Sequence, residues 1–262
     1  MEAILVIVTF FATVLGAISG IGGGVIIKPV MDALCDYPVA TISFLSGNTV
    51  LAMTAVSLLR SRKDTIKIDS VVGFPLALGG VFGGVIGKIL FTFVRQNTQH
   101  DGRIGMIQNI IMVILTATVF VYVLNKHKIH TLHMTNKAGS LLAGLALGIF
   151  SSFLGIGGGP INIMVLSYLF SMDSKHAAIN SLYIIFFSQV ANLLTNIIQG
   201  AIPAFSYLLL STMMASGVIG AMAGRKASSK LDNNQIDKLF MGIMLVIVAL
   251  SVYNVFGYAA LS

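Results

Sequence analysis

Apolar residues run through this sequence in long stretches, and six of these stretches have no polar or glycine-rich interruption. A helix that spans the hydrocarbon core of a bilayer needs about 20 predominantly apolar residues, and each of the six is about that long. The pattern therefore predicts six full membrane-spanning helices, at Asp36–Leu59, Asp69–Val94, Gly105–Leu124, Ala177–Ile198, Ala204–Ala223 and Ile236–Phe256.

Two further apolar stretches, Ala3–Leu34 and Ser140–Leu169, are each broken by a glycine-rich segment. The breaks read Gly-Ile-Gly-Gly-Gly at 20–24 and Gly-Ile-Gly-Gly-Gly-Pro at 155–160. Adjacent glycines remove side-chain packing and permit positive φ, which disfavours a continuous helix. Pro160 fits the first turn of a new helix, where its missing N–H costs nothing. Each stretch is therefore predicted to be two helical pieces that meet at a glycine turn.

The order of these features repeats, so the chain contains two related halves. The two glycine breaks are 135 residues apart. Features that recur at a spacing of 137 are Ala40 and Ala177, Ser43 and Asn180, and the Gly-x-x-Gly-x-x-x-Gly motifs at 80–87 and 217–224. We therefore predict one membrane transporter domain, 1–262, made of repeat 1 at about 1–127, a loop at 128–135 and repeat 2 at about 136–262. Sequence repeats of this kind are common in transporters.

Two topologies are open for the glycine-broken stretches. If each crosses the membrane once, the repeats are parallel; if each is a re-entrant hairpin, each half crosses three times and the repeats are inverted. Lys and Arg gather on the cytoplasmic side of membrane proteins. With parallel repeats, the Lys and Arg residues divide almost evenly between the two sides of the membrane. With hairpins, twelve lie on one side and only three, Lys88, Arg95 and Arg103, lie on the other. The predicted fold is all-α: two inverted repeats, each a re-entrant helix pair plus three transmembrane helices, with both termini outside.

Composition supports a membrane protein and excludes other classes. Of 262 residues, 56% are hydrophobic and 10% are charged, whereas a soluble domain carries about a quarter charged residues. The net charge of +7 is explained by basic loops rather than by a nucleic-acid partner. The single cysteine, Cys35, excludes a disulfide framework and a Cys-based metal site. We expect no cofactor, no metal and no enzymatic activity, with the lipid bilayer and a small anion as partners and a homo-oligomer left open.

The glycine turns are predicted to bind that anion. The first N–H groups of a helix lack intrahelical partners and carry partial positive charge, and glycine lets a ligand approach the backbone closely. Two such turns related by pseudo-symmetry bring two positive helix ends together near the membrane midplane. Close helix packing is the other use of glycine in membranes. We assign that use to Gly80, Gly83, Gly87, Gly217, Gly220 and Gly224.

The predicted substrate-binding residues combine the two turns with nearby polar side chains. They are Gly20, Gly22, Gly23, Gly24, Lys28, Ser43, Gly155, Gly157, Gly158, Gly159, Asn180 and Ser181. Lys28 lies one helical turn beyond the first glycine turn, where its charge either reinforces an anion site or snorkels to the surface. Its counterpart in the second half is Ile163, so such a role is asymmetric.

Other polar residues have weaker predictions. Gln189 and Asn192 share one face of a predicted span and either line a pathway or bond neighbouring helices. The nine carboxylates fall at segment ends or in loops, so no buried carboxylate is expected as a proton relay or a cation ligand. His127, His130 and His133 are expected in a solvated basic loop.

The glycine breaks and the helix starts that follow them resemble the TauE/SafE family of sulfite-exporter-like membrane permeases. The resemblance rests on Gly20–Gly24 with Pro29 and Pro38–Ala40, and on the second copy, Gly155–Pro160 with Ala177–Ser181. It covers essentially the whole chain. It implies a multi-pass plasma-membrane carrier of small sulfur-containing or organic anions, such as sulfite, sulfonates or sulfoacetate. Where the family usually has Thr-Ser at these helix starts, this chain has Ser43-Phe44 and Asn180-Ser181.

The sequence as a whole predicts a secondary transporter of a small anion, held at the midplane between the two glycine turns, with access alternating as one repeat rocks against the other. A passive anion channel and a membrane subunit without transport of its own are the alternatives.

Overall fold

A computed structural model describes residues 2–61, 70–98 and 101–261, and this part of the chain is helical, without strands. The first half contains α1 (Glu2–Ser19), α2 (Gly24–Leu34), α3 (Val39–Ser61), α4 (Ser70–Asn97) and α5 (Asp101–Asn125), followed by the short 3₁₀ turn η1 (Lys126–Lys128). The second half contains α6 (Lys137–Leu154), α7 (Pro160–Phe170), α8 (Ser174–Ile198), α9 (Tyr207–Ser228) and α10 (Asn233–Leu261).

The helices confirm the predicted all-α membrane protein. Within the described ranges, 8 helices are long and apolar enough to cross a membrane. The six predicted spans correspond to α3, α4, α5, α8, α9 and α10, although Asp69, the predicted start of one span, lies outside the described residues. The two glycine-broken stretches form the pairs α1–α2 and α6–α7, and α7 begins at Pro160 as expected.

Both glycine turns lie inside the molecule, because residues 20–24 and 155–159 are all buried. The first and third residues of each turn, all glycines, have positive φ, whereas the turns differ at the next residue, where φ is −67° at Gly23 and 134° at Gly158. Gly20 and Gly155 have φ of 77° and 65°, and Gly22 and Gly157 have φ of 77° and 69°. These positive values explain the glycines, since a residue with a side chain is strained in this region.

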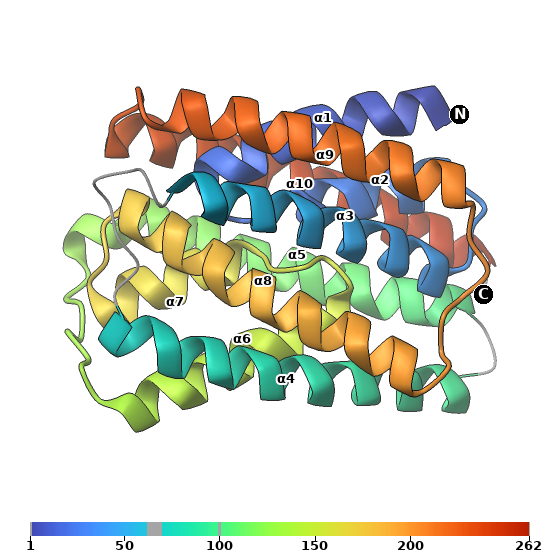
Figure 1. Ribbon diagram of the computed structural model, residues 1–262, viewed down its shortest axis with the longest axis horizontal. Helices are drawn as coiled ribbons and strands as arrows, with labels where there is room; N and C mark the ends of the chain where they lie inside the picture. Colours follow the sequence, from blue (N-terminus) through green and yellow to red (C-terminus); the bar gives the residue numbers. More distant parts are fainter. Residues whose placement is uncertain (1, 62–69, 99–100, 262) are drawn as a thin grey trace.

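The remaining helix ends gather at two opposite ends of the molecule (Figure 1). At one end, which we call the linker end, Lys126 of η1 forms an ion pair with Asp237 of α10, and Ser174 Oγ at the start of α8 donates to Asp237 Oδ1 at 2.7 Å. At the opposite end, which we call the terminal end because both chain termini lie there, Thr41 Oγ1 of α3 donates to the Ala204 carbonyl before α9 at 3.0 Å. The pair α1–α2 starts and finishes at the terminal end, and α6–α7 at the linker end.

The two halves interlock. Helix α4 packs mainly on α6 and α8 of the second half, while α9 packs mainly on α1 and α3 of the first. Glycines make these contacts close: a Cβ on Gly83 would lie 2.1 Å from the Leu145 carbonyl oxygen, and one on Gly220 would lie 2.5 Å from the Phe10 carbonyl oxygen. The structure thus confirms the packing role predicted for these glycines.

The contacts correct one part of the predicted repeat alignment. Gly80 faces Ile184, and its counterpart Gly217 faces Thr49. Ile184 and Thr49 are 135 residues apart, so α3 and α8 align at the same spacing as the glycine turns. The spacing of 137 applies only from α4 and α9 onward, so the second half has two more residues than the first between the middle of α8 and the start of α9. The predicted pairing of Ser43 with Asn180 was therefore wrong by two positions.

Candidate functional site

The two glycine turns are held by a reciprocal pair of hydrogen bonds. Ser46 Oγ of α3 donates to the carbonyl oxygen of Gly155 at 3.0 Å, and Ser181 Oγ of α8 donates to the carbonyl oxygen of Gly20 at 2.6 Å. The two donor serines are 135 residues apart in the sequence, and so are the two acceptor glycines. The serine of each half therefore fixes the turn of the other half, and Ser181 lies beside a turn as the sequence predicted.

The turns also touch one another. A Cβ added to Gly24 would lie 2.1 Å from the carbonyl oxygen of Ile156, and one on Gly22 would lie 3.6 Å from the carbonyl oxygen of Gly157. The N–H of Gly23 donates to the sulfur of Met53 at 3.3 Å. Sulfur is a weak acceptor, so an anion oxygen would be a stronger partner for this N–H.

Ser43 lies next to the second glycine turn, and Asn180 directly precedes Ser181 on α8. A Cβ on Gly155 would lie 2.4 Å from Ser43 Oγ, and this hydroxyl is buried without a hydrogen-bond partner in the described ranges. Asn180 donates from Nδ2 to the His176 carbonyl at 2.9 Å, while its Oδ1 has no partner among the same residues. Both side chains therefore offer polar atoms that the described part of the protein leaves unused.

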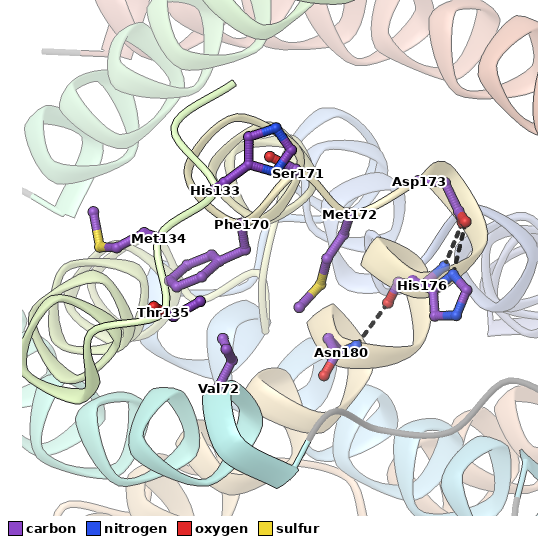
Figure 2. A pocket seen from close by; sticks show the side chains of 10 residues that line it. All are labelled: Val72, His133, Met134, Thr135, Phe170, Ser171, Met172, Asp173, His176 and Asn180. Carbon is purple, nitrogen blue, oxygen red and sulfur yellow. Dashed lines mark hydrogen bonds and ion pairs between the residues drawn. The ribbon is translucent and has the colours of Figure 1, made fainter. Parts of the chain in front are cut away.

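A vestibule of about 410 Å³ opens at the linker end and reaches Asn180 (Figure 2). Its wall is formed by the segment that links the halves, by the end of α7 and by the starts of α4 and α8. The lining residues are Val72, His133, Met134, Thr135, Phe170, Ser171, Met172, Asp173, His176 and Asn180. His133 and Ser171 adopt positive φ, 46° and 55°, which is unusual for residues other than glycine.

Asp173 carries the negative charge in this vestibule. Burial raises the pKa of its carboxyl group, but hydrogen bonds from the backbone and ring of His176, together with the imidazole charge, bring the net pKa below its usual value. Asp173 also caps α8, since Oδ1 accepts from the His176 N–H at 3.0 Å. Because the folded-state pKa is lowered, the carboxylate stabilises the fold above the unfolded pKa of about 3.9, and this contribution is lost as the pH falls through the folded-state value.

Asp173→Ala is expected to reduce the free energy of unfolding by about 1 kcal/mol at neutral pH, because α8 loses its N-cap. Asp173→Asn keeps a capping oxygen and should cost less than half as much. Thermal unfolding of both variants in detergent, measured by circular dichroism at pH 7 and pH 4, tests this. Equal losses at pH 7 would show that the charge, and not the cap, is what α8 requires.

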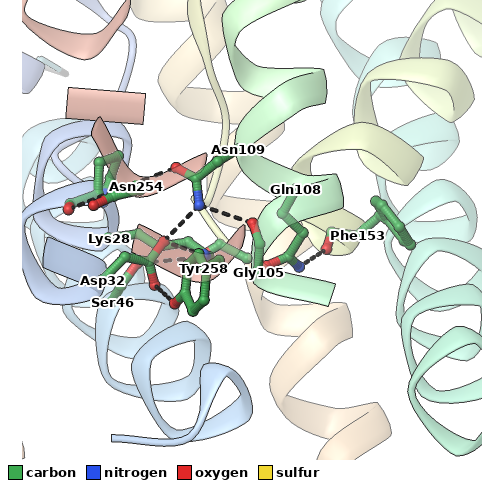
Figure 3. A network of polar contacts seen from close by, with 11 residues as sticks. Lys28, Asp32, Ser46, Gly105, Gln108, Asn109, Phe153, Asn254 and Tyr258 are labelled. Atoms are coloured by element: carbon green, nitrogen blue, oxygen red, sulfur yellow. Dashed lines mark hydrogen bonds and ion pairs between the residues drawn. The ribbon is translucent and has the colours of Figure 1, made fainter. Parts of the chain in front are cut away.

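Lys28 forms a buried ion pair with Asp32, whereas the sequence suggested a charge that reinforces an anion site or reaches the surface. Its Nζ lies 2.8 Å from Asp32 Oδ2, and the two side chains are only 3% and 1% exposed (Figure 3). Asp32 also accepts from Asn109 Nδ2 of α5 at 3.1 Å and from Tyr258 Oη of α10 at 3.1 Å. The charge of Lys28 is thus balanced within α2. Asp32 lies near the end of a helical segment, as the sequence indicated, but its burial there was not predicted.

A row of buried polar side chains follows α8 from the centre of the molecule toward the terminal end. Gln189 and Asn192 share one buried face of α8, as predicted. Ser151 of α6 and Asn196 of α8 are buried too and extend the row. Asn162, in the first turn of α7, was not among the residues predicted from the sequence. It is 1% exposed, and its amide oxygen and nitrogen both lack partners in the part of the chain described. Its signal was a lone amide two residues after Pro160 in an apolar run.

Three of the five histidines lie along the segment that links the halves. No group of three or more His, Cys, Asp or Glu side chains is close enough to hold a metal ion in the ranges that the structure covers. His127, His130 and His133 lie in and after η1 and are all exposed, and His133 also lines the vestibule.

Comparison with known proteins decides the family. The sequence profile described as "Sulfite exporter TauE/SafE" matches residues 5–251. The chain belongs to the TauE/SafE family. This confirms the resemblance read from the glycine breaks, and with the apolar helices it identifies a multi-pass transporter of the cell membrane.

Relatives within the family carry the same general name. A "Probable membrane transporter protein" of Haemophilus influenzae is 26% identical over 195 residues, covering 72% of this chain and 70% of the relative. The "Probable membrane transporter protein YunE" of Bacillus subtilis is 25% identical over 247 residues, covering 87% and 90%. The corresponding protein YdhB of the same organism is 22% identical over 226 residues, covering 85% and 89%. These names describe transporters rather than enzymes. No solved structure matches the chain.

Proposed function

We propose that this TauE/SafE protein is a secondary transporter of a small anion, a sulfur oxyanion or an organosulfonate, bound where the two glycine turns meet. The observation that carries the proposal is the pair of buried turns, each fixed by a serine of the opposite half. Two helix N-termini, those of α2 and α7, point their positive ends into this region. Helix N-termini of this kind bind anions through backbone N–H groups.

In the membrane, we propose that the pairs α1–α2 and α6–α7 are re-entrant hairpins of two inverted repeats. Their arrangement at opposite ends of the molecule supports this topology (Figure 1). Charge supports it as well, because the segments at the linker end include Lys126, Lys137, Lys175 and Lys238. By the positive-inside rule the linker end is then cytoplasmic and the terminal end external.

Transport in this proposal requires the turns to separate. Val50 and Ile185 pack against the turns, so an anion reaches the N–H groups only after the halves rock apart. The vestibule provides the cytoplasmic route, with Asn180 at its inner end. The Ser43 hydroxyl and the second N–H of Asn180 Nδ2 would then donate hydrogen bonds to the oxygens of the anion. Ser181 would do so once the separation of the turns releases its hydroxyl from the Gly20 carbonyl. None of these groups fixes a charge, which leaves release of the anion unhindered.

Flux into proteoliposomes tests the function. Purified protein should take up labelled sulfite with saturation, and unlabelled anion inside the vesicles should accelerate uptake. Sulfonates, sulfate, thiosulfate and carboxylates added as competitors would define the anion class. Uptake without saturation or counterflow would identify a channel, and no flux of any of these anions through folded protein would identify a non-transporting subunit.

Asn180→Asp tests the site itself. The substitution keeps the size of the side chain but adds a negative charge at the inner end of the vestibule, so KM for sulfite should rise at least tenfold. Asn125→Asp is the matched control: Asn125 makes the same hydrogen bond to the carbonyl four residues earlier, at 2.8 Å, but is exposed. Its KM should stay within twofold of the wild type. An unchanged KM in Asn180→Asp would remove Asn180 from the binding site.

A further inference from the structure

The row of polar side chains on α8 ends at a small cavity beside the second glycine turn. The cavity has a volume of about 10 Å³, enough for about one water molecule or one oxygen atom. Ser151, Gly158, Gly159 and Asn162 are among the residues that line it. The same wall includes the first residues of α7, whose N-terminus is the positive end of the helix.

Asn162 is the residue that this cavity leaves unsatisfied. Its side chain is 1% exposed, and neither Oδ1 nor Nδ2 has a hydrogen-bond partner in the described ranges. A buried amide without partners costs about 1–3 kcal/mol for each unmade bond, so a group from outside the chain is expected to supply them. The first half has Ile27 at the equivalent position, which makes this amide a feature of α7 alone.

From the cavity toward the terminal end, the polar side chains form a chain of three consecutive hydrogen bonds. Gln189 Nε2 donates to Ser151 Oγ at 3.4 Å, Asn192 Nδ2 donates to Gln189 Oε1 at 3.4 Å, and Asn196 Nδ2 donates to Asn192 Oδ1 at 3.5 Å. These contacts are at the long limit of hydrogen-bond geometry. These hydrogen bonds are weak, so the amide donors can exchange their present acceptors for the oxygen of an anion with little loss of hydrogen-bond energy.

We propose that Ser151, Gln189, Asn192 and Asn196 form the external half of the anion pathway, and that Asn162 at its inner end binds one oxygen of the transported oxyanion. This inference rests on the proposed function and adds to it a route and a specificity-determining residue. Uncharged amides and a hydroxyl suit an anion that must move, because each donates a hydrogen bond without the tight hold of a buried cation. Since these side chains carry no charge, the positive end of α7 sets the direction of the field along the row.

Thiol labelling tests the route. In a Cys35→Ser background, Asn192→Cys should react with externally added sulfonatoethyl methanethiosulfonate, an anion, at least tenfold faster than with the cationic trimethylammonium reagent. An excess of a simple alkylsulfonate, which unlike sulfite does not cleave methanethiosulfonates, should slow the reaction. Leu194→Cys is the control, because Leu194 is 52% exposed on the outer surface of the bundle and would face lipid. The background substitution leaves a single thiol in each variant, since Cys35 is the only native cysteine.

The outcomes separate this inference from the proposed function. If the Asn192→Cys protein transports sulfite but reacts no faster than the Leu194→Cys control, or reacts equally with both reagents, the route is wrong while the transporter stands. If no variant and no wild-type sample moves any anion, the proposed function fails first.

Asn162→Leu tests the end of the route, with Ile27→Leu as the matched change in the other half. Asn162→Leu should raise KM for sulfite at least tenfold and reduce discrimination between sulfite and sulfate, with little change in thermal stability, because an unsatisfied amide is replaced by an apolar group. Ile27→Leu should leave both values within twofold. An unchanged KM and selectivity in folded Asn162→Leu protein would overturn the assignment of Asn162.

Discussion

Asp32→Asn is expected to lower the free energy of unfolding by about 3–5 kcal/mol, because removal of one member of a buried ion pair leaves the other charge uncompensated. Lys28 has little alternative, since its side chain is 3% exposed and Asp32 is the partner within reach. The loss extends beyond the pair. The same carboxylate accepts from Asn109 and Tyr258 and so joins α2 to α5 and α10 (Figure 3).

Circular dichroism in detergent micelles measures this effect as a lower Tm. Asp232→Asn is the control, because Asp232 is exposed and its capping bond to the Gln235 N–H, 2.7 Å long, is one that asparagine can also make; its Tm should hardly change. The double variant Lys28→Met with Asp32→Leu removes both charges and should recover most of the loss. A double variant as unstable as Asp32→Asn would show that the hydrogen bonds, rather than the charge balance, stabilise α2.

Gly24→Ala is expected to separate the two glycine turns and to abolish anion uptake. Its Cβ would lie 2.1 Å from the carbonyl oxygen of Ile156 and 2.8 Å from its carbonyl carbon. These are backbone atoms, which cannot move aside as a flexible side chain can. Overpacking of this kind costs about 1–3 kcal/mol, and here it also displaces the N-terminus of α2 from its partner turn.

Gly242→Ala is the matched change, because an added Cβ on Gly242 would have no neighbour within 4 Å among the described residues. Alanine in place of a helical glycine with room for it stabilises by about 0.4–1 kcal/mol. We therefore expect Tm to fall in Gly24→Ala and to rise in Gly242→Ala, with sulfite uptake lost only in the first. Retained uptake in Gly24→Ala would show that the contact between the turns is not needed for transport.

The helices and the breaks could be predicted because they depend on local composition. A run of apolar residues predicts a span without reference to the rest of the chain, and three adjacent glycines interrupt a helix wherever they occur. The predicted site was also placed from local composition, at the glycine turns and the polar helix starts, and Ser181 does contact the turn at Gly20. The alignment of the halves was less secure, since a motif match does not reveal where two extra residues are inserted.

The buried carboxylate could not be predicted from its neighbours in sequence. Asp32 lies three residues before Cys35, where α2 has ended, and a carboxylate near a helix end is normally solvated. What buries it comes from far along the chain: Asn109 and Tyr258 belong to α5 and α10. Asn162 was missed for a similar reason, because the cavity that leaves its amide unsatisfied also needs Met112 and Leu115 of α5.

The interlocked halves also constrain how the protein is made. Helix α4 leaves the ribosome before its main partner α6 exists, and α5 must wait for α10, the last helix, to be translated. The first half therefore inserts into the bilayer before the helices that pack against the glycines of α4 (Gly80, Gly83 and Gly87) have been made. Chaperones or the insertion machinery would have to shield these glycines until the second half arrives. The two halves expressed as separate polypeptides should consequently be degraded when alone and accumulate only when produced together.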